Sequence, residues 1–289
     1  MSHRLVMDIA NREGGISPIV VTPPSSLEMP NFRELWEYRG LFFFLIRRDI
    51  KLRFQQTVIG FLWILLQPLI QMLIFYVILG VLIGVPTNGI PYPIFFLSAF
   101  VVWQFFTQVV NYSAFSLVGN IGVIVKSYFP RLALPLSTVG TALVDFAVSF
   151  LLLLVFLLMN GNYPITFRYL LLPVLLVITI IFSSGVGLLF GALMVVFRDT
   201  KNFLNFVLMM WMYITPIAYP TSIAPEKYRV LFYLNPLTSL VDAYRWVFLG
   251  QGSLPRLSYL AISLSVAIVI WFWGAIAFKA MENRIADVM

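Results

Sequence analysis

Uncharged amides recur at helical spacing inside two hydrophobic stretches of this sequence. Each set of amides lies beside a tryptophan, and the two sets are Trp63, Gln67 and Gln71, and Trp103, Gln104, Gln108 and Asn111. Spacings of three and four residues place the amides of each set on one face of a helix. Because an amide in hydrocarbon leaves its donors and acceptors unpaired, each face should meet other helices or water.

Two kinds of chemistry fit these amide faces. Hydrogen bonds between helices are one, and each contributes only about 0.6 kcal/mol on average. Binding of a bulky hydroxylated ligand such as a sugar is the other, because sugars hydrogen-bond to amides and stack on aromatic rings without a fixed charge. A path for ions or protons would more often carry several ionisable groups. Asp145 is the one acid clearly at membrane depth, and we expect it to have a partner or an interior position.

Four cations precede the first hydrophobic stretch: Arg47, Arg48, Lys51 and Arg53. They end a segment, residues 31–54, that is too charged to span a bilayer but mixes large apolar side chains with acids and arginines. This pattern predicts an interfacial helix on the inner leaflet, followed by a basic collar. The collar either fixes the topology or attracts anionic headgroups. The net charge of +7 is accordingly expected to meet lipid and not nucleic acid.

The sequence excludes several kinds of catalytic and metal site. It has no cysteine, and its one histidine, His3, lies in a polar N-terminal segment. Thiolate metal sites, disulfides and a histidine-based triad are thereby excluded. The phosphate-binding motif GxxxxGK followed by Ser or Thr is also absent. We therefore expect no catalytic residue, metal or cofactor in this chain, and any ATP and Mg²⁺ would bind a separate ATPase subunit.

Membrane-spanning helices must position these residues. Of the 289 residues, 61% are apolar and 11% are charged, and the mean hydropathy is +0.93. Long apolar runs predict an all-α integral membrane protein. Six spans are expected, at about 58–84, 93–117, 136–159, 169–196, 203–219 and 256–278.

Charge and composition set the expected topology and the domain boundaries. Six spans put both termini on one side, where fourteen of the nineteen Lys and Arg residues fall, so the termini are predicted to be cytoplasmic. Residues 1–30 contain four prolines and resemble a disordered tail. The interface helix and collar occupy 31–57, the six-helix domain 58–279, and a second cytoplasmic tail 280–289.

Two connections are long enough to hold helices of their own. On the inner side, residues 119–135 have room for a short helix along the membrane. On the outer side, residues 219–255 are mostly apolar and rich in proline and glycine.

One helix is well signalled within the outer connection. Asn235 stands at a cap position, Pro236 at the first helical position and Gly250 at the stop, which predicts a helix over about 236–249. This helix is too short to cross a bilayer, so a re-entrant or surface position is expected. Asp242 and Arg245 lie three residues apart on it, and we favour a modest exposed ion pair.

Three stretches resemble the characteristic motifs of one family. They are RRDIKLRFQQTVIGFLWILLQPL (47–69), FRDTKNF (197–203) and NPLTSLVDAYRW (235–246), and they resemble those of type-2 ABC exporter permeases for O-antigen, teichoic acid and capsular polysaccharide. The resemblance extends over about residues 31–285. It implies a transporter subunit that moves lipid-linked polysaccharide across the bacterial inner membrane, as a homodimer with two copies of a separate ABC ATPase.

The resemblance also implies roles for segments and residues. It implies a gate helix over 31–54, a coupling helix over about 119–133 and outer gate helices over about 221–249. The four collar cations would bind the substrate headgroup, and the two amide and tryptophan sets would line the glycan path. ATPase coupling is expected from Lys126, Tyr128, Phe129 and Arg131, and the outer gate from Asn235, Pro236, Asp242 and Arg245.

Three other functions stay open at this point. An ABC permease for a small hydrophobic drug or antibiotic would have the same architecture. A membrane-embedded transferase acting on a lipid carrier would need an acid/base or metal-binding cluster, whereas the acids near the predicted membrane are scattered. A secondary transporter usually has repeated halves and ionisable coupling sites, and neither is evident.

Overall fold

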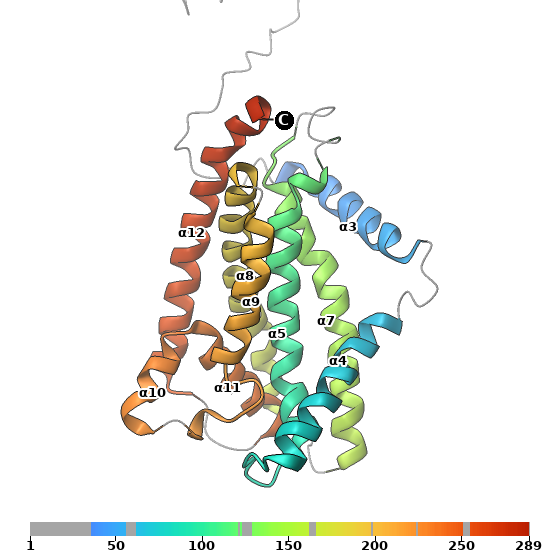
Figure 1. Cartoon of the computed structure of the whole chain (residues 1–289). Helices are drawn as coiled ribbons and strands as arrows, with labels where there is room; N and C mark the ends of the chain where they lie inside the picture. The colour runs from blue at the N-terminus through green and yellow to red at the C-terminus, as the bar shows by residue number, and fades with distance from the viewer. Residues whose placement is uncertain are drawn as a thin grey trace, which may run out of the picture.

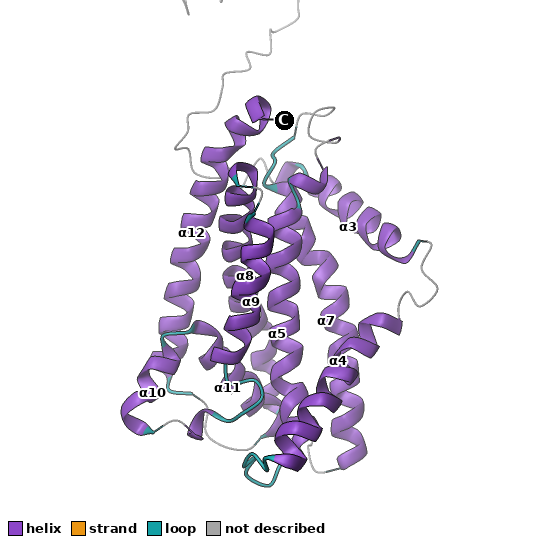
Figure 2. Ribbon diagram, viewed as in Figure 1, coloured by secondary structure: helices purple, strands orange, loops and turns teal. Residues whose placement is uncertain are grey.

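The computed structural model describes residues 36–55, 62–120, 122, 129–161, 166–197, 199–223, 225–250 and 255–288. Throughout these ranges every regular element is a helix (Figure 1, Figure 2). Five helical segments are long and apolar enough to cross a membrane: Leu62–Leu82, Tyr92–Phe115, Ala133–Asn160, Phe167–Val196 and Leu257–Met281. The expected all-α membrane protein is thereby confirmed. The predicted tail 1–30, the start of the interface segment and residues 121 and 123–128 of the inner connection lie outside the described residues.

Helix α5 (Tyr92–Phe115) is the central helix of the bundle. Of its most apolar window, 83% is buried inside the protein, in keeping with large apolar side chains on most of its surface. Phe96 stacks on Phe100 with ring centroids 5.1 Å apart, and Phe106 stacks on Phe182 of α8 at 5.3 Å. Helices α4, α7, α8 and α11 pack around α5.

Helices α8 (Leu172–Val196) and α12 (Leu257–Val288) approach each other most closely at two glycines. A β-carbon on Gly185 would lie 2.6 Å from the Trp271 Cα, and one on Gly274 would collide with the Gly185 backbone. Small residues permit this backbone contact, which is a common way to join helices in a membrane. The 3₁₀ turn η3 (Phe167–Leu171) precedes α8.

Helix α4 (Leu62–Phe75) continues directly into a π-helix, η1 (Tyr76–Leu82), and runs obliquely across the bundle in Figure 1. Pro68 lies inside α4, where it removes one backbone hydrogen bond. Only 17% of the most apolar window of this span is buried. Its contact with the centre of the bundle is made near η1, where Phe75 stacks on Phe96 at 4.9 Å. Most of this span therefore faces outward from the single chain.

Helix α9 (Thr200–Ile214) is shorter than the span predicted over 203–219. It has 15 residues, about 22 Å of helix, and it ends where Pro216 restricts Thr215 to an extended conformation. The helix therefore ends five residues before the predicted end of the span at residue 219. In Figure 1, α9 runs alongside α8.

Two short helices close the end of the bundle opposite to α3: α10 (Glu226–Tyr233) and α11 (Pro236–Leu249), after the 3₁₀ turn η4 (Thr221–Ile223) (Figure 1). The helix predicted over 236–249 is confirmed. The Asn235 side chain accepts a hydrogen bond from the Leu237 amide, and Gly250 ends the helix with φ of 66°. Most of α11 is buried, against α5 and α12 among others.

Helix α7 (Ala133–Asn160) carries α3 (Arg39–Phe54) on its first half, and Figure 1 shows α3 projecting sideways from the bundle. The Ile46 side chain occupies the space above Gly140, where any β-carbon would collide with it. Leu45 is 1% exposed and lies in a hydrophobic cluster with Leu117 and Phe129. The collar cations are therefore held at a fixed place, beside the first turns of α7 and the last turns of α5.

Candidate functional site

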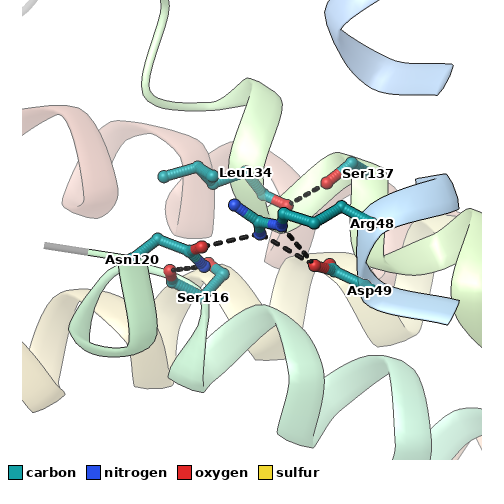
Figure 3. A network of polar contacts seen from close by, with 6 residues as sticks. All are labelled: Arg48, Asp49, Ser116, Asn120, Leu134 and Ser137. Atoms are coloured by element: carbon teal, nitrogen blue, oxygen red, sulfur yellow. Dashed lines mark hydrogen bonds and ion pairs between the residues drawn. The ribbon is translucent and has the colours of Figure 1, made fainter. Parts of the chain in front are cut away.

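Arg48 connects α3 to the end of α5 (Figure 3). Its Nε and Nη2 donate to the Asp49 carboxylate at 2.9 and 2.7 Å, and Nη2 also donates to the Asn120 Oδ1 at 2.6 Å. Asn120 belongs to the 3₁₀ turn η2 (Val118–Asn120), and its own Nδ2 donates to the Ser116 carbonyl at 2.8 Å. Arg48 thus positions α3 relative to α5 and has several of its donors already in use.

Arg53 connects α3 to the middle of α7. Its Nη1 forms an ion pair with the Asp145 carboxylate, and its guanidinium lies 5.4 Å from the Tyr112 ring centroid. The Tyr112 hydroxyl also donates to Asp145, at 3.4 Å. The Asp145 side chain is 2% exposed and that of Arg53 is 34% exposed. The expectation that Asp145 has a partner and an interior position is confirmed.

A cavity of about 440 Å³ lies between α3, α5 and α7, beside this ion pair. Asp49 and Arg53 line it from α3, Tyr112 from α5, and Thr138 and Thr141 from α7. The Thr141 hydroxyl is buried and has no hydrogen-bond partner among the described residues. The wall of the cavity is mostly apolar but carries the Thr138 and Thr141 side chains and the charged Asp49 and Arg53, which suits an amphiphilic ligand.

The four collar cations separate into two kinds. Arg47 and Lys51 are exposed on α3, whereas Arg48 and Arg53 are partly buried and hydrogen-bonded to other elements. An exposed cation can bind a lipid phosphate without breaking any contact within the protein. A paired cation must first break its hydrogen bonds or ion pair. The sequence pattern grouped all four because it contains no information on their partners.

The second amide set faces the interior of the protein. Trp103 and Gln104 are 5% and 4% exposed, and the Ser149 hydroxyl of α7 donates to the Gln104 Oε1 at 3.3 Å. Gln108 is partly buried, and its Oε1 has no partner among the described residues. Asn111 is also partly buried and donates to the Thr107 carbonyl of its own helix at 2.9 Å. In this structure Gln104 joins two helices of one chain.

The first amide set lies on the outward face of α4. Trp63 is 55% exposed and Gln67 is exposed. Gln71, one turn further, is partly buried, and its Oε1 has no partner within the described ranges. Exposed amides on a membrane-length helix need water, another protein surface or a ligand.

A comparable face on α9 was not predicted from the sequence. Asn202 and Asn205 are exposed there together with Phe206 and Tyr213. Their spacing of three or four residues could have revealed the face, but this segment attracted notice only through its motif, FRDTKNF. The Trp211 ring fixes α9 on α5 through an edge contact with Phe106 at 5.3 Å. Because α4 also contacts α5, the two exposed amide faces flank the central helix.

The outer-gate residues lie together near α11. Asn235 ties α11 to the end of α9: its Oδ1 accepts from the Trp211 Nε1 at 3.0 Å, and its Nδ2 donates to the Thr215 hydroxyl at 2.9 Å. Pro236, the first residue of α11, is buried. This polar junction joins the C-terminal end of α9 to the N-terminal end of α11.

The favoured exposed ion pair between Asp242 and Arg245 is wrong. Arg245 is 7% exposed, and its guanidinium donates to the Ile217 and Tyr219 carbonyls. Burial lowers the pKa of Arg245 to about 10, so the group stays charged at neutral pH. Burial also raises the pKa of the Asp242 carboxyl, although Arg245 and hydrogen bonds from Thr221 and Tyr233 oppose that shift. The helix lies inside the protein, which the three-residue spacing could not reveal.

The proposed coupling residues are only partly described. Lys126 and Tyr128 lie outside the described residues. Phe129 is buried in the hydrophobic cluster around Leu45, and Arg131 is partly buried. Nowhere in the described ranges do three His, Cys, Asp or Glu side chains gather where they could hold a metal ion.

Comparison with known proteins identifies the family. The family model described as ABC-2 type transporter matches residues 40–249. The O-antigen export system permease protein RfbA of Myxococcus xanthus is 31% identical over 258 residues, which cover 88% of this chain and 97% of that protein. Its namesake in Klebsiella pneumoniae is 30% identical over 242 residues, covering 84% and 92%. The polysialic acid transport protein KpsM of Escherichia coli is 27% identical over 247 residues, covering 83% and 92%. A chain with membrane-length helices that matches this family over most of its length belongs to the ABC-2 type transporter family.

Proposed function

We propose that this chain is the permease subunit of an ATP-driven exporter that moves lipid-linked polysaccharide from the cytoplasm across the bacterial inner membrane. The observation that carries the proposal is similarity over more than four-fifths of the chain to permeases named for O-antigen export. The cavity beside α3 supports it, because its mostly apolar wall with the charged Asp49 and Arg53 side chains suits an amphiphilic substrate.

In the proposed topology the chain crosses the membrane six times, with α9 as the fifth crossing and both termini in the cytoplasm. Helix α3 lies along the inner leaflet, and α10 and α11 are re-entrant helices at the outer face. The short α9 is compatible with a crossing because most of the non-helical residues 215–220 are buried against protein, where the Thr215 and Ile217 amides donate to backbone carbonyls.

A second copy of the chain would complete the transport path. Helix α4 and helix α9 expose amides and aromatic rings on either side of α5, and such faces are unfavourable in lipid. A homodimer in which these faces meet would enclose a passage lined by Trp63, Gln67, Asn205 and Tyr213. In this arrangement Trp103 and Gln104 would lie inside each protomer and would pack behind the residues that line the passage.

The headgroup of the substrate would first meet the two exposed collar cations. Arg47 and Lys51 each contribute on the order of 1 kcal/mol toward an anionic lipid at the membrane surface. The headgroup would then pass the cavity beside Arg53, which its pairing with Asp145 holds at the cavity wall.

Two copies of a separate ABC ATPase would supply the energy and bind ATP and Mg²⁺. They would contact the chain on the cytoplasmic side, around Lys126, Tyr128 and Arg131. Phe129 would hold this segment on the bundle through its buried ring.

Deletion of the gene and complementation test the proposal. Surface polysaccharide should be lost in the deletion strain and restored by the wild-type permease. An ABC ATPase and a glycolipid should copurify with the permease from native membranes and be identified by mass spectrometry. Unchanged surface polysaccharide in the deletion strain, together with altered drug resistance, would instead favour a permease for a small hydrophobic compound.

A further inference from the structure

A second, larger cavity lies at the opposite end of the bundle from α3. Its volume is about 640 Å³, and it is enclosed by the loop before α5, by η4, α10 and α11, and by the start of α12. This end of the bundle carries α10 and α11 in Figure 1. Neither the amide faces nor the basic collar contributes to it, whereas the outer-gate residues Asp242 and Arg245 line it.

The lining of this cavity is basic. Arg229 of α10, Arg245 of α11 and Arg256, immediately before α12, line it, while Asp242 is the one acid among its described lining residues. Asp242 already accepts hydrogen bonds from the Thr221 hydroxyl at 2.7 and 2.8 Å and from the Tyr233 hydroxyl at 3.1 Å. Three arginines, two from helices and one from the segment before α12, therefore line one space, where the one carboxylate among the described lining residues already accepts hydrogen bonds.

Arg245 is built rigidly into the wall of the cavity. Its Nη1 and Nη2 donate to the Tyr219 and Ile217 carbonyls at 3.4 and 2.5 Å, and its guanidinium lies 3.8 Å from the Phe95 ring centroid. Its Nε is buried and has no hydrogen-bond partner among the described residues. The protein thus holds a desolvated cation at this wall of the cavity.

We propose that this cavity binds a phosphate or diphosphate group. Guanidinium forks match the oxygens of phosphate in geometry as well as charge, which makes arginine the preferred residue for such groups. The volume exceeds that of a phosphate ion, so the group can be carried by a larger organic molecule. The stacked rings of Tyr233 and Tyr259, with centroids 4.0 Å apart, give this part of the lining a rigid aromatic wall.

This inference rests on the proposed function only for the source of the phosphate. In an exporter of lipid-linked glycan, the cavity would receive the lipid phosphate at the outer face after the headgroup has left the inner one. A free phosphate compound on that side would satisfy the same chemistry.

Direct binding measurements test the cavity. The full-length permease is placed in phosphatidylcholine nanodiscs without its ATPase, since an ATPase binds phosphates itself. Inorganic pyrophosphate and farnesyl diphosphate are titrated by calorimetry into wild type, Arg229→Gln, Arg256→Gln and the control Lys227→Gln. Lys227 lies on α10, two residues from Arg229, but outside the cavity lining. Arg245 is not substituted because it donates to the Tyr219 and Ile217 carbonyls, and its loss would disturb the fold.

The two arginine substitutions should each weaken binding of the diphosphate about ten-fold, while Lys227→Gln changes it less than about two-fold. Tighter binding of farnesyl diphosphate than of pyrophosphate identifies a lipid as the source, and equal affinities identify free phosphate. Absence of saturable binding of both probes to wild type overturns the inference, as does an equal loss in all three variants. Complementation by wild type separately tests the export function, so the two proposals fail independently.

Discussion

Arg53 on α3 and Asp145 on α7, 92 residues apart in the chain, form an ion pair in which the acid is almost fully buried and the base is one-third exposed. This asymmetry predicts unequal effects of the two single substitutions. Arg53→Gln leaves a buried carboxylate without its cation, whereas Asp145→Asn leaves an arginine that can reach solvent. We expect the free energy of unfolding to fall by about 2–3 kcal/mol in Arg53→Gln and by about 1 kcal/mol in Asp145→Asn.

Thermal unfolding of the purified full-length permease measures both losses. The double variant should regain part of the stability, because it removes both charges. Arg47→Gln, on the exposed side of the same helix, is the matched control and should change stability by less than about 0.5 kcal/mol. Equal losses for the two single variants would mean that the buried acid is not the more dependent partner.

The basic collar should separate into lipid-binding and structural cations. Arg47→Gln and Lys51→Gln should each lower affinity for anionic vesicles by about five-fold, through loss of about 1 kcal/mol, without changing the unfolding temperature. Arg48→Gln should instead destabilise the protein, because it releases Asp49 and Asn120. Sedimentation with vesicles containing phosphatidylglycerol, beside a thermal melt, distinguishes the two effects. If Arg48→Gln weakened lipid binding and left the unfolding temperature unchanged, the assignment of Arg48 as a structural cation would be disproved.

The amide faces of α4 and α9 should lie at the boundary between two copies. The chain has no cysteine, so a single introduced cysteine is its only thiol and every crosslink forms through that position. Gln67→Cys and Asn205→Cys should each give a covalent dimer with a short bismaleimide in native membranes. Trp273→Cys is the control, since this α12 residue is 68% exposed but belongs to an apolar surface. Dimers formed through Trp273→Cys alone would place the boundary on α12 and remove the proposed passage.

Stability should fall with rising pH through the ionisation of Asp242. Burial raises the pKa of this carboxyl in the folded protein, whereas the pKa of an aspartate in an unfolded chain is about 3.9. Between these values the folded state binds more protons than the unfolded state, so the free energy of unfolding decreases as pH rises and levels off above the raised pKa. Asp242→Asn removes this titration and should flatten that part of the curve.

Unfolding temperatures of wild type and Asp242→Asn across the acidic range provide the measurement. The difference between the two proteins is the relevant quantity, because other acids titrate in both. A wild-type curve that rises more steeply than that of Asp242→Asn over this interval would show that Arg245 and the two hydroxyl donors outweigh burial.

Local signals in the sequence were sufficient wherever neighbouring residues decide the structure. Asn235, Pro236 and Gly250 define α11 because capping and termination involve only the adjacent backbone. The apolar runs predicted the five membrane-length helices for the same reason. Helix α9 ends before the predicted span does, because the apolar run continues beyond Pro216, although the helix does not.

Helical spacing determined which residues share a face, but only the tertiary structure decided what each face meets. Gln67 and Gln104 have similar sequence surroundings, yet one is exposed on α4 and the other bonds to Ser149 inside the bundle. Likewise, nothing near Arg53 in sequence specifies Asp145 as its partner. These outcomes depend on contacts between distant segments, such as the contact of Ile46 with Gly140. The spacing of residues within one helix carries no information about such contacts.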